Sequence, residues 1–533
     1  MSRRAVLAGG AALGTWALAG GTPPTTAADP PFDGSDEAAR LRAAYDVRVK
    51  AAALARDRVD GTQATNGDED GVERWAAAYS KGLPHGRDGE VNPKAYPIYL
   101  RAVRSGRHQD FEAIPLGGFV KLANPQAAWA FDLVGPDATQ PVLPPPPRFS
   151  SDEQAAELAE LYWQALTRDI PFAEYDRNPV IAKACDDLSH MPAFKGPRRD
   201  GHVTPDVLFR GTTRGDLIGP YVSQFLLLDL PILPIRVEQR IRTAAPGVDY
   251  MTTYDEWLAI QDGKLAAVNT FDAQTRYLRN GRDLGEYVHR DFTYQGFLGA
   301  CLLALRMGTQ PDGANPYKHS RTQSGFTTFG QPYLIYLIAV VTQAALKACW
   351  YQKWRVHRRL RPEELAGRVD NHVRGVRQYP LHQSLLDSGA LAAVRAASGS
   401  ALLPQAYPEG CPTHPAYPAG HAVIAGACAT VLKTMLDESH VIPEPMQPSA
   451  DGLTLTPWKG ADLTVGNELD KLACNIAMGR NIAGIHWRTD CAAGLALGED
   501  VALAVLDEMR LTGNELYTGC SLRRFDGRTV RAG

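Results

Sequence analysis

The sequence lacks a large excess of either positive or negative charge. Among 533 residues, 56 Lys and Arg oppose 59 Asp and Glu, which gives a formal net charge of −3 at pH 7. A nearly neutral chain has no bulk electrostatic attraction to nucleic acid or to an anionic membrane. The share of hydrophobic residues, 44%, is that of an ordinary globular protein. No nucleic-acid partner is therefore expected, although a local basic pocket is still compatible with the composition.

Long hydrophobic runs and paired cysteines are also missing. Beyond the N-terminus, no segment reaches the roughly 18 uninterrupted apolar residues of a membrane span. The best run, "YLIYLIAVV" from Tyr333, is short and predicts a buried core helix. The eight cysteines contain no CxxC pair. Four of them lie in apolar helical patterns, where buried free thiols are expected: Cys349, Cys428, Cys474 and Cys491. The sequence assigns no disulfide.

Residues 1–28 have the order of a secretory signal peptide. Arg3 and Arg4 precede an uncharged apolar stretch, and a Pro/Thr-rich segment ends near Ala28. The paired arginines, followed by Val6 and Leu7, resemble a bacterial twin-arginine signal. We therefore expect export to the periplasm or medium by the twin-arginine route. An ordinary secretory peptide is the alternative.

Strand patterns are scarce, and no internal repeat is visible. Residues 29–150 predict one helix, opened by Ser35, and then an irregular Pro/Gly-rich segment. From residue 151 to 533, long helical patterns dominate, beginning with a helix capped by Ser151. Three further runs are predicted as helices: "LIGPYVSQFLLLDL", "TYDEWLAIQDG" and "YQGFLGACLLALRM". The sequence thus predicts a mainly α protein with one large, bundle-like helical domain.

The first cluster of reactive residues is "WYQKWRVHRRLRP", from Trp350 to Pro362. On one helix, the spacing places Trp350, Lys353, His357 and Leu360 on a single face. Arg361 lies just before a proline, which is expected to disrupt the helix. A solvated basic surface is the usual interpretation of such a run. The apolar turns before it favour partial burial instead, and a buried cation needs an anionic partner.

The second cluster is "HPAYPAGH", which runs from His414 to His421. Pro418 and Gly420 predict a turn, and an Ala/Val/Ile-rich helix is expected to begin near His421. The first N–H groups of a helix are unpaired and carry partial positive charge, so they can hold an anion. His421 could then exchange a proton with that anion. A histidine that only caps a turn is the alternative.

The third cluster is "GRNIAGIHWRTD", in which Arg480 and His486 flank a glycine-containing turn. Asp490 follows His486 by four residues, one helical turn, which would bring its carboxylate beside the imidazole. A carboxylate in that place fixes the tautomer of a ligating histidine and raises its basicity. An ordinary surface Asp–His pair is the alternative.

Taken together, the three clusters predict a site for a tetrahedral oxyanion. Lys353, Arg361 and Arg480 supply positive charge, and the helix start near His421 supplies N–H donors. One histidine can bond the central atom of the anion, and the other can move protons.

The three motifs, in this order, resemble the signature shared by vanadium-dependent haloperoxidases and the type 2 phosphatidic acid phosphatase superfamily. The carrying segments are "KWRVHRRLRP", "PAGH" and "GRNIAGIHWRTD". The seven-residue spacer between Lys353 and Arg361 is similar to that of the algal bromoperoxidase-like and bacterial branch, as are "GPYVSQFL", "DEWLAIQDG" and "RNGRDLGEYVHRD". The resemblance spans about residues 205–510. It implies a fold of the acid phosphatase/vanadium haloperoxidase type, built on four-helix bundles and often homo-oligomeric.

The resemblance also implies a vanadate cofactor within residues 350–490 and a role for each motif residue. His486 would bond vanadium, with Asp490 behind it. The groups that hold the vanadate oxygens would be Lys353, Arg361, Arg480 and the Gly420 N–H. Lys353 would also polarise bound peroxide, and His421 would be the acid–base group. Trp350 would line the site, and His414 would tune halide preference.

The activity so implied is oxidation of bromide, or iodide, by hydrogen peroxide to hypohalous acid, which halogenates small organic acceptors. Two alternatives stay open. The same pocket could hydrolyse phosphate esters as an acid phosphatase, with His486 attacking phosphorus. Alternatively, the chain could be a peroxovanadate-using homologue with weak halogenation. Ala419 and Gly479 stand where the family has serines, and one lost charge-assisted hydroxyl bond is typically worth ~1.5–3 kcal/mol.

Overall fold

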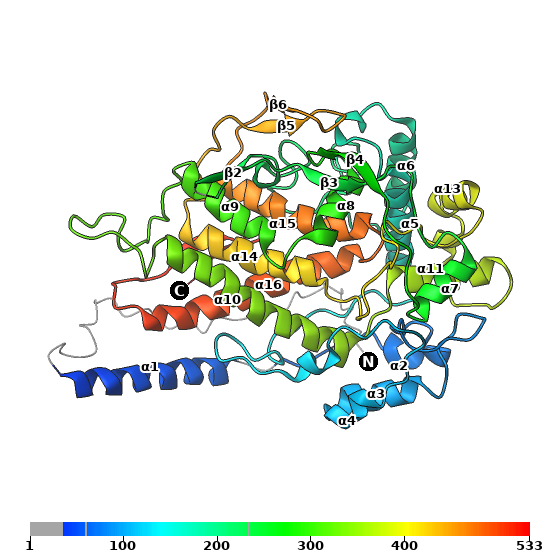
Figure 1. Cartoon of the computed structure of the whole chain (residues 1–533), viewed down its shortest axis with the longest axis horizontal. Helices are drawn as coiled ribbons and strands as arrows, with labels where there is room; N and C mark the ends of the chain where they lie inside the picture. Colours follow the sequence, from blue (N-terminus) through cyan, green and yellow to red (C-terminus); the bar gives the residue numbers. More distant parts are fainter. Residues whose placement is uncertain (1–35, 59–60, 233, 533) are drawn as a thin grey trace, which may run out of the picture.

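The computed structural model describes residues 36–58, 61–232 and 234–532, and the expected signal peptide, residues 1–28, lies outside them (Figure 1). In this part of the chain there are sixteen α-helices, and the strands are short antiparallel pairs. The helices are α1 (Glu37–Asp57), α2 (Asp68–Gly71), α3 (Tyr96–Ser105), α4 (His108–Glu112), α5 (Asp152–Thr167), α6 (Pro179–Ser189), α7 (Tyr254–Gln261), α8 (Gly281–Arg290), α9 (Gln295–Arg306), α10 (Gln331–Tyr351), α11 (Pro362–Val373), α12 (Gln383–Leu386), α13 (Gly389–Ser398), α14 (Gly420–Met435), α15 (Val465–Ile482) and α16 (Arg488–Met509). The strand pairs are β1 (Leu230–Ile232) with β2 (Ile235–Val237), β3 (Ile241–Ala244) with β4 (Phe271–Arg276), β5 (Met446–Pro448) with β6 (Leu455–Pro457), and β7 (Cys520–Arg523) with β8 (Thr529–Ala532). The mainly α prediction is confirmed.

Helix α14 is the centre of the main bundle. Its sequence is apolar on every side, and nearly all of its residues are buried. A helix of that kind has to lie inside the protein, and α10, α15 and α16 pack around it (Figure 1). The contact with α16 is close: a Cβ added to Gly498 would come within 1.9 Å of the Val423 carbonyl oxygen. This packing fixes the start of α14, where the site lies, relative to α16.

A second hydrophobic cluster joins α5, α6, α11 and α13 beside the bundle, toward the right of Figure 1. Helix α5 begins as the sequence predicts, because the Ser151 hydroxyl oxygen accepts a hydrogen bond from the Gln154 N–H at 3.1 Å. Its buried face carries two carboxylates, Glu157 and Glu160. These acidic groups face α16 and become important for the site.

Helix α10 is the longest apolar segment among the described residues. Together with the turn that follows, Gln331–His357, it is long and apolar enough by composition alone to cross a membrane. About half of it is buried, however, and it packs against α14 and α16. It is therefore placed as the core helix that the sequence predicts. All eight cysteines are buried and free, as expected for the four in helical patterns.

The structure corrects three expectations about local structure. The segment "LIGPYVSQFLLLDL" forms turns with one short 3-10 segment, Gln224–Leu226, and its last residue begins β1, because Gly219 takes a positive φ of 76° before Pro220. Residues 61–150 are not simply irregular: they contain α2, α3 and α4, and these pack against Trp354 in a core of their own. Helix α1 is capped by Asp36, whereas Ser35 lies outside the described residues.

Candidate active site

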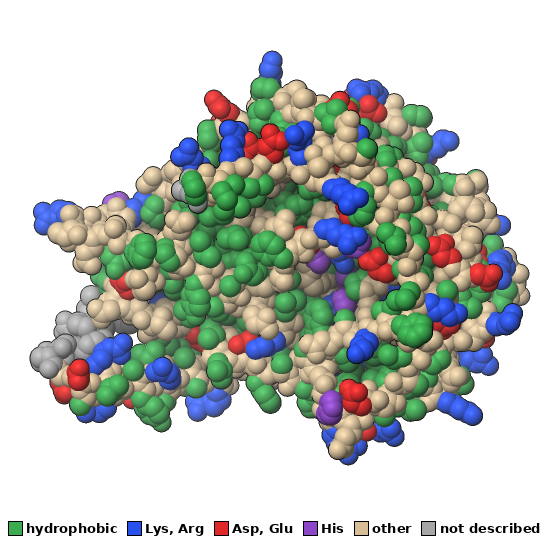
Figure 2. All heavy atoms as spheres, in the orientation of Figure 1, with side chains coloured by type: hydrophobic (Ala, Val, Ile, Leu, Met, Phe, Trp, Pro, Cys, Tyr) green, Lys and Arg blue, Asp and Glu red, His purple; other side chains and the backbone are tan. Residues whose placement is uncertain are grey.

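The motif residues meet where α10, α11, α14 and α15 end or begin, together with the turn before α16. In the space-filling view, histidine and basic side chains gather in a hollow over this region, to the right of the centre (Figure 2). The structure brings together all nine residues singled out from the sequence: Trp350, Lys353, Arg361, His414, Gly420, His421, Arg480, His486 and Asp490. Their functional roles rest on the geometry described next.

Lys353 lies in a π-helical segment, Gln352–His357, that extends α10. Its ammonium donates to the carbonyl oxygens of Pro415 at 2.9 Å and Ala416 at 2.7 Å. An ammonium has three donors, so one is left for a ligand. Burial lowers the pKa of Lys353 to about 7, because the charged form is poorly solvated and other cations are close.

The π-helical segment overturns the single helix face expected for this motif. The helix ends at Arg358, which has a φ of 39°, so Leu360 belongs to a different core cluster. The His357 ring packs edge-on against Tyr417, and neither of its nitrogens has a hydrogen-bond partner among the described residues. Burial lowers the pKa of His357 to about 3, which keeps it neutral. Pro362 does not disrupt a helix; it is the first residue of α11.

Arg361, just before α11, connects the other two motifs. Its Nε–H donates to the His414 carbonyl oxygen at 2.8 Å, and Nη1 donates to the Ile485 carbonyl oxygen at 2.7 Å. Nη1 also lies 2.9 Å from Nε2 of His486, and Nη2 lies 2.8 Å from Nδ1 of His414. One fully buried guanidinium therefore sets the separation between the two histidines. Trp350 packs against His414, with ring centroids 4.9 Å apart.

His486 is held in one tautomer. Its Nδ1 lies 2.8 Å from the Asp490 carboxylate, which can only accept, so Nδ1 carries the proton. Nε2 is then unprotonated, and its lone pair, which a ligating imidazole requires, accepts a hydrogen bond from Nη1 of Arg361 at 2.9 Å in this structure. The two residues do not share a helix, contrary to expectation: His486 lies in the turn before α16, and Asp490 also accepts from the Trp487 N–H at 3.2 Å.

Sequence reasoning missed Arg359, which holds Asp490 in place. Its Nη1 donates to the second Asp490 oxygen at 2.7 Å, and its Nη2 donates to Gln154 and Glu157 of α5, each at 2.7 Å. A chain of contacts thus runs from α5 through Arg359 and Asp490 to His486. The run of arginines in the motif was visible, but nothing in it distinguished Arg359 from its neighbours.

Arg480, near the end of α15, points toward the same space. Its Nη1 donates to the Val288 carbonyl oxygen in α8 at 2.6 Å, while its Nε has no partner among the described residues. Its charge contributes to lowering the pKa of His414, His421 and His486. Gly479 lets α8 approach this closely, since a Cβ there would lie 3.1 Å from the Val288 side chain.

His421, the second residue of α14, has a partner that sequence reasoning did not assign. Its Nε2 lies 3.0 Å from Asp291, which directly follows α8. Burial, together with Arg480, lowers the pKa of His421, although Asp291 opposes the shift. Asp291 is the last residue of "RNGRDLGEYVHRD", a segment already matched to the family, so the resemblance contained the signal.

The start of α14 is open, as an anion cradle requires. Ala419 is its N-cap and has no side chain that can cap the helix. A Cβ added to Gly420 would meet only Trp350, at 3.7 Å, so there is free space beside the first N–H groups. Because those groups have no intrahelical partner, this space suits an oxyanion. A serine at position 419 would place a hydroxyl there.

The charges around this space fit an oxyanion cofactor such as vanadate. Lys353, Arg361 and Arg480 are buried without a carboxylate partner among the described residues. The other three buried lysines each form an ion pair: Lys81, Lys433 and Lys471. Burying unpaired cations is costly, so an anion should complete the site. The described residues contain no cluster of three acidic, His or Cys ligands for a bare metal ion.

The fold and site define a class: a helical-bundle enzyme that holds a tetrahedral oxyanion with cations, a helix start and one histidine. The comparisons agree. Residues 333–514 match the family model described as the vanadium chloroperoxidase second helical-bundle domain. The chain is 36% identical to a vanadium-dependent bromoperoxidase of Ascophyllum nodosum over 94% of this chain and 93% of the relative. It is 33% identical to one of Corallina pilulifera, over 92% and 98%. The chain belongs to the vanadium-dependent bromoperoxidase family.

A solved structure agrees with the sequence relatives. The homohexameric second vanadate-dependent bromoperoxidase of Ascophyllum nodosum superposes with a TM-score of 0.88 at 29% identity. The match covers all of this chain and 94% of that one. The chain is therefore a vanadate-dependent haloperoxidase of the bromoperoxidase type, and the fold and cofactor expected from the sequence are confirmed.

Proposed function

We propose that this chain oxidises bromide, and also iodide, with hydrogen peroxide at a vanadate bound to His486 among Lys353, Arg361 and Arg480. The observation that carries the proposal is the buried set of cations without a carboxylate partner around the unprotonated Nε2 of His486. Bound vanadate supplies a Lewis-acidic centre at which peroxide becomes electrophilic toward a halide. The hypohalous acid that forms then halogenates small organic acceptors.

The cations hold negative charge at fixed positions. Lys353 and Arg361 are held in place by backbone carbonyl acceptors, so their remaining donors are preorganised for the anion. Preorganised donors stabilise developing negative charge without reorganising during the reaction. Lys353, whose pKa burial lowers to about 7, becomes fully protonated once an anion lies beside it, because an opposite charge favours the charged form.

His421 and Asp291 form the proton-transfer pair. With Nε2–H donating to Asp291, the Nδ1 atom of the neutral ring is a proton acceptor. The lowered pKa of His421 keeps the ring neutral near pH 7, so it can take a proton from peroxide and return it to a leaving oxygen. Asp291 fixes the ring orientation and stabilises the imidazolium that forms in between.

The halide preference is proposed to depend on His414. Arg361 donates to its Nδ1, and Trp350 packs against its ring, so the side chain is held at the edge of the cavity. Burial and the nearby cations lower the pKa of His414 well below its ordinary value, which keeps it neutral. A neutral ring presents its Nε2 edge to the approaching halide. The names of the relatives support bromide.

The test combines elemental analysis with a kinetic assay. Purified protein loaded with vanadate should retain vanadium after dialysis, consume peroxide only when bromide or iodide is present, and brominate a phenol dye. Protein that retains vanadium yet oxidises neither halide would refute the proposal. A phosphatase assay on vanadate-free protein measures the acid phosphatase alternative separately.

Two further expectations are proposals that rest on sequence and relatives. Export by the twin-arginine route is supported by Arg3 and Arg4 ahead of the apolar stretch, and replacing both with lysine should leave the protein in the cytoplasm of an expressing bacterium. A homo-oligomer is supported by the homohexameric relative. Light scattering on the purified protein measures its mass in solution.

A further inference from the structure

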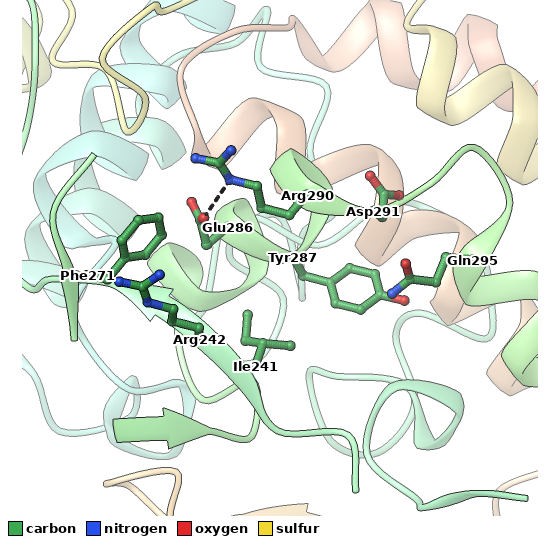
Figure 3. A pocket seen from close by; sticks show the side chains of 8 residues that line it. All are labelled: Ile241, Arg242, Phe271, Glu286, Tyr287, Arg290, Asp291 and Gln295. Carbon is green, nitrogen blue, oxygen red and sulfur yellow. Dashed lines mark hydrogen bonds and ion pairs between the residues drawn. The ribbon is translucent and has the colours of Figure 1, made fainter. Parts of the chain in front are cut away.

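A cavity of about 500 Å³ is lined by the end of α8 together with β3 and β4, and its lining does not include Lys353, Arg361 or Arg480. Figure 3 shows its wall: Arg242 comes from β3 and Phe271 from β4, while Glu286, Tyr287 and Arg290 come from α8, and Asp291 follows that helix. A cavity of a few hundred cubic ångströms suits a small organic molecule. The mechanism described above uses none of these residues except Asp291.

The cavity adjoins the active site through a shared residue. Asp291 lines the cavity, and its carboxylate lies 3.0 Å from Nε2 of His421. The residue three positions earlier, Val288, provides the carbonyl oxygen that holds Arg480. The same helix end thus borders the cavity on one side and the anion site on the other, so a ligand in the cavity lies next to the acid–base pair.

The wall of the cavity carries two cations, Arg242 and Arg290, and two carboxylates, Glu286 and Asp291, but these charges differ in their partners. Arg290 pairs with Glu286 at 3.2 Å, and His289 and Asn269 also contact Glu286. Asp291 is engaged by His421. The exposed side chain of Arg242 has no ion pair or hydrogen bond among the described residues, and its guanidinium lies 3.9 Å from the centroid of the Phe271 ring. The cavity therefore offers one free cation over an aromatic wall that also includes Tyr287.

We propose that this cavity binds the organic acceptor, and that the acceptor is an electron-rich aromatic ring carrying a carboxylate. Its ring packs on Phe271 and Tyr287, and its carboxylate pairs with Arg242. This inference rests on the proposed halide oxidation. Hypobromous acid formed at the anion site transfers bromine to the ring: the new C–Br bond forms as the Br–O bond breaks, and the displaced ring proton and hydroxide leave as water.

The first experiment measures binding without any turnover. Isothermal titration of vanadate-free protein with 4-hydroxybenzoate and with phenol should show tighter binding of the carboxylate. Arg242→Gln should weaken binding of 4-hydroxybenzoate by about fivefold, the loss of one partly exposed ion pair, and leave phenol unchanged. Arg236→Gln, on strand β2, which precedes β3 in the chain but belongs to a different sheet, is the matched control: Arg236 pairs with Asp229 outside the cavity, and its replacement should change neither. Phe271→Leu should weaken binding of both ligands.

The second experiment measures selectivity during turnover. With bromide and peroxide, the enzyme should brominate 4-hydroxybenzoate in preference to phenol, relative to the ratio that added hypobromite gives in solution. Arg242→Gln should bring the two ratios together while bromide-dependent peroxide consumption stays at the wild-type rate. Equal ratios for wild type and free hypobromite, or no effect of Arg242→Gln on carboxylate binding, would overturn the acceptor site and leave halide oxidation standing. Loss of halide oxidation in the wild type would instead refute the proposed function, and the titration would still decide whether the cavity binds the acid.

Discussion

This protein buries its cations in two different ways, and Arg359 and Arg361, two residues apart, are an example of each. Arg359, Arg488 and Lys471 each contact a buried carboxylate at hydrogen-bonding distance. Lys353 and Arg361 are equally buried, but they contact only carbonyl oxygens and histidine nitrogens. Arg359 and Arg488 connect α5 with the start of α16, whereas Lys471 pairs within α15. The unpaired cations surround a space.

The difference shows which charges serve folding and which serve binding. Removing one partner of a buried ion pair leaves the other charge unpaired, so the paired set should matter for stability. An unpaired buried cation already bears the cost of desolvation, and it recovers that free energy only when an anion arrives. Substitution of a paired cation should therefore mainly lower stability, whereas substitution of an unpaired cation should mainly weaken anion binding.

The largest effect on stability is expected at Arg359. Arg359→Gln leaves Glu157 and Asp490 buried without their cation, and should lower the free energy of unfolding by about 3–5 kcal/mol in urea titrations. It should also weaken vanadate binding, because Asp490 no longer holds His486 firmly. Arg488→Gln is the matched control: it strands Glu160 but leaves Asp490 untouched, so folded protein should keep its vanadate affinity. Wild-type stability for Arg359→Gln would contradict the distinction.

Lys353→Met should show the opposite signature. It removes one donor to the anion, so vanadate affinity should fall by ~1.5–3 kcal/mol in calorimetric titrations. The unfolding free energy of the vanadate-free protein should change by no more than about 1 kcal/mol, because no carboxylate loses its partner. Lys471→Met is the control, since it strands Glu468, whose carboxylate otherwise contacts only the Gln224 N–H among the described residues, and it should mainly destabilise. A large loss of stability for Lys353→Met with unchanged affinity would reverse the assignment.

A larger side chain at position 479 tests whether the position of α8 matters for Arg480, one of the unpaired cations. Gly479→Ser would place a Cβ 3.1 Å from Val288 and 3.2 Å from Leu284, and such overpacking costs about 1–3 kcal/mol. Moving α8 would displace both the acceptor of Arg480 and Asp291, so bromide oxidation should fall along with thermal stability. Gly285→Ala, on the facing helix, meets its nearest atom only at 3.7 Å and should be tolerated. Equal effects of the two variants would argue against this role.

The pH dependence of anion binding should report Lys353. Sulfate is a suitable probe, since its charge is constant near neutral pH. The pKa of Lys353 is about 7, below its ordinary value, so above pH 7 the anion-free site must take up a proton on binding. Sulfate affinity should fall by at most about tenfold per pH unit above that point. The lowered pKa values of His414, His421 and His486 keep these rings neutral there, so Lys353→Met should abolish the dependence.

The smallest effect is expected at Ala419. Ala419→Ser restores a hydroxyl beside the open start of α14. It should strengthen vanadate binding by up to ~1.5 kcal/mol and increase the rate of bromide oxidation. Part of the gain could be spent on capping the helix, which stabilises by about 1 kcal/mol, so thermal melts should be recorded in parallel. No change in bromide oxidation would show that the missing serine does not limit this enzyme.

Much of the site could be predicted because its chemistry depends on local spacing. His486 and Asp490 are four residues apart, and Gly420 begins an apolar helix, so their roles follow from short segments. The arginine run could not be resolved in the same way. Arg355, Arg358, Arg359 and Arg361 look alike in sequence, and the π-helical turn with the positive φ of Arg358 decides which one faces the anion.

The sequence by itself determined the residue types, the helical class and the family of this protein, because motifs and apolar periodicity are local properties. Only the tertiary structure decided which buried cations remain unpaired, since that depends on where Glu157 and Glu160 of α5 come to lie. It likewise decided that Asp291, 130 residues before His421, orients the acid–base ring. It also placed Arg242 over Phe271 beside that same carboxylate. Charge compensation is a property of the packed protein, so no reading of single segments could supply it.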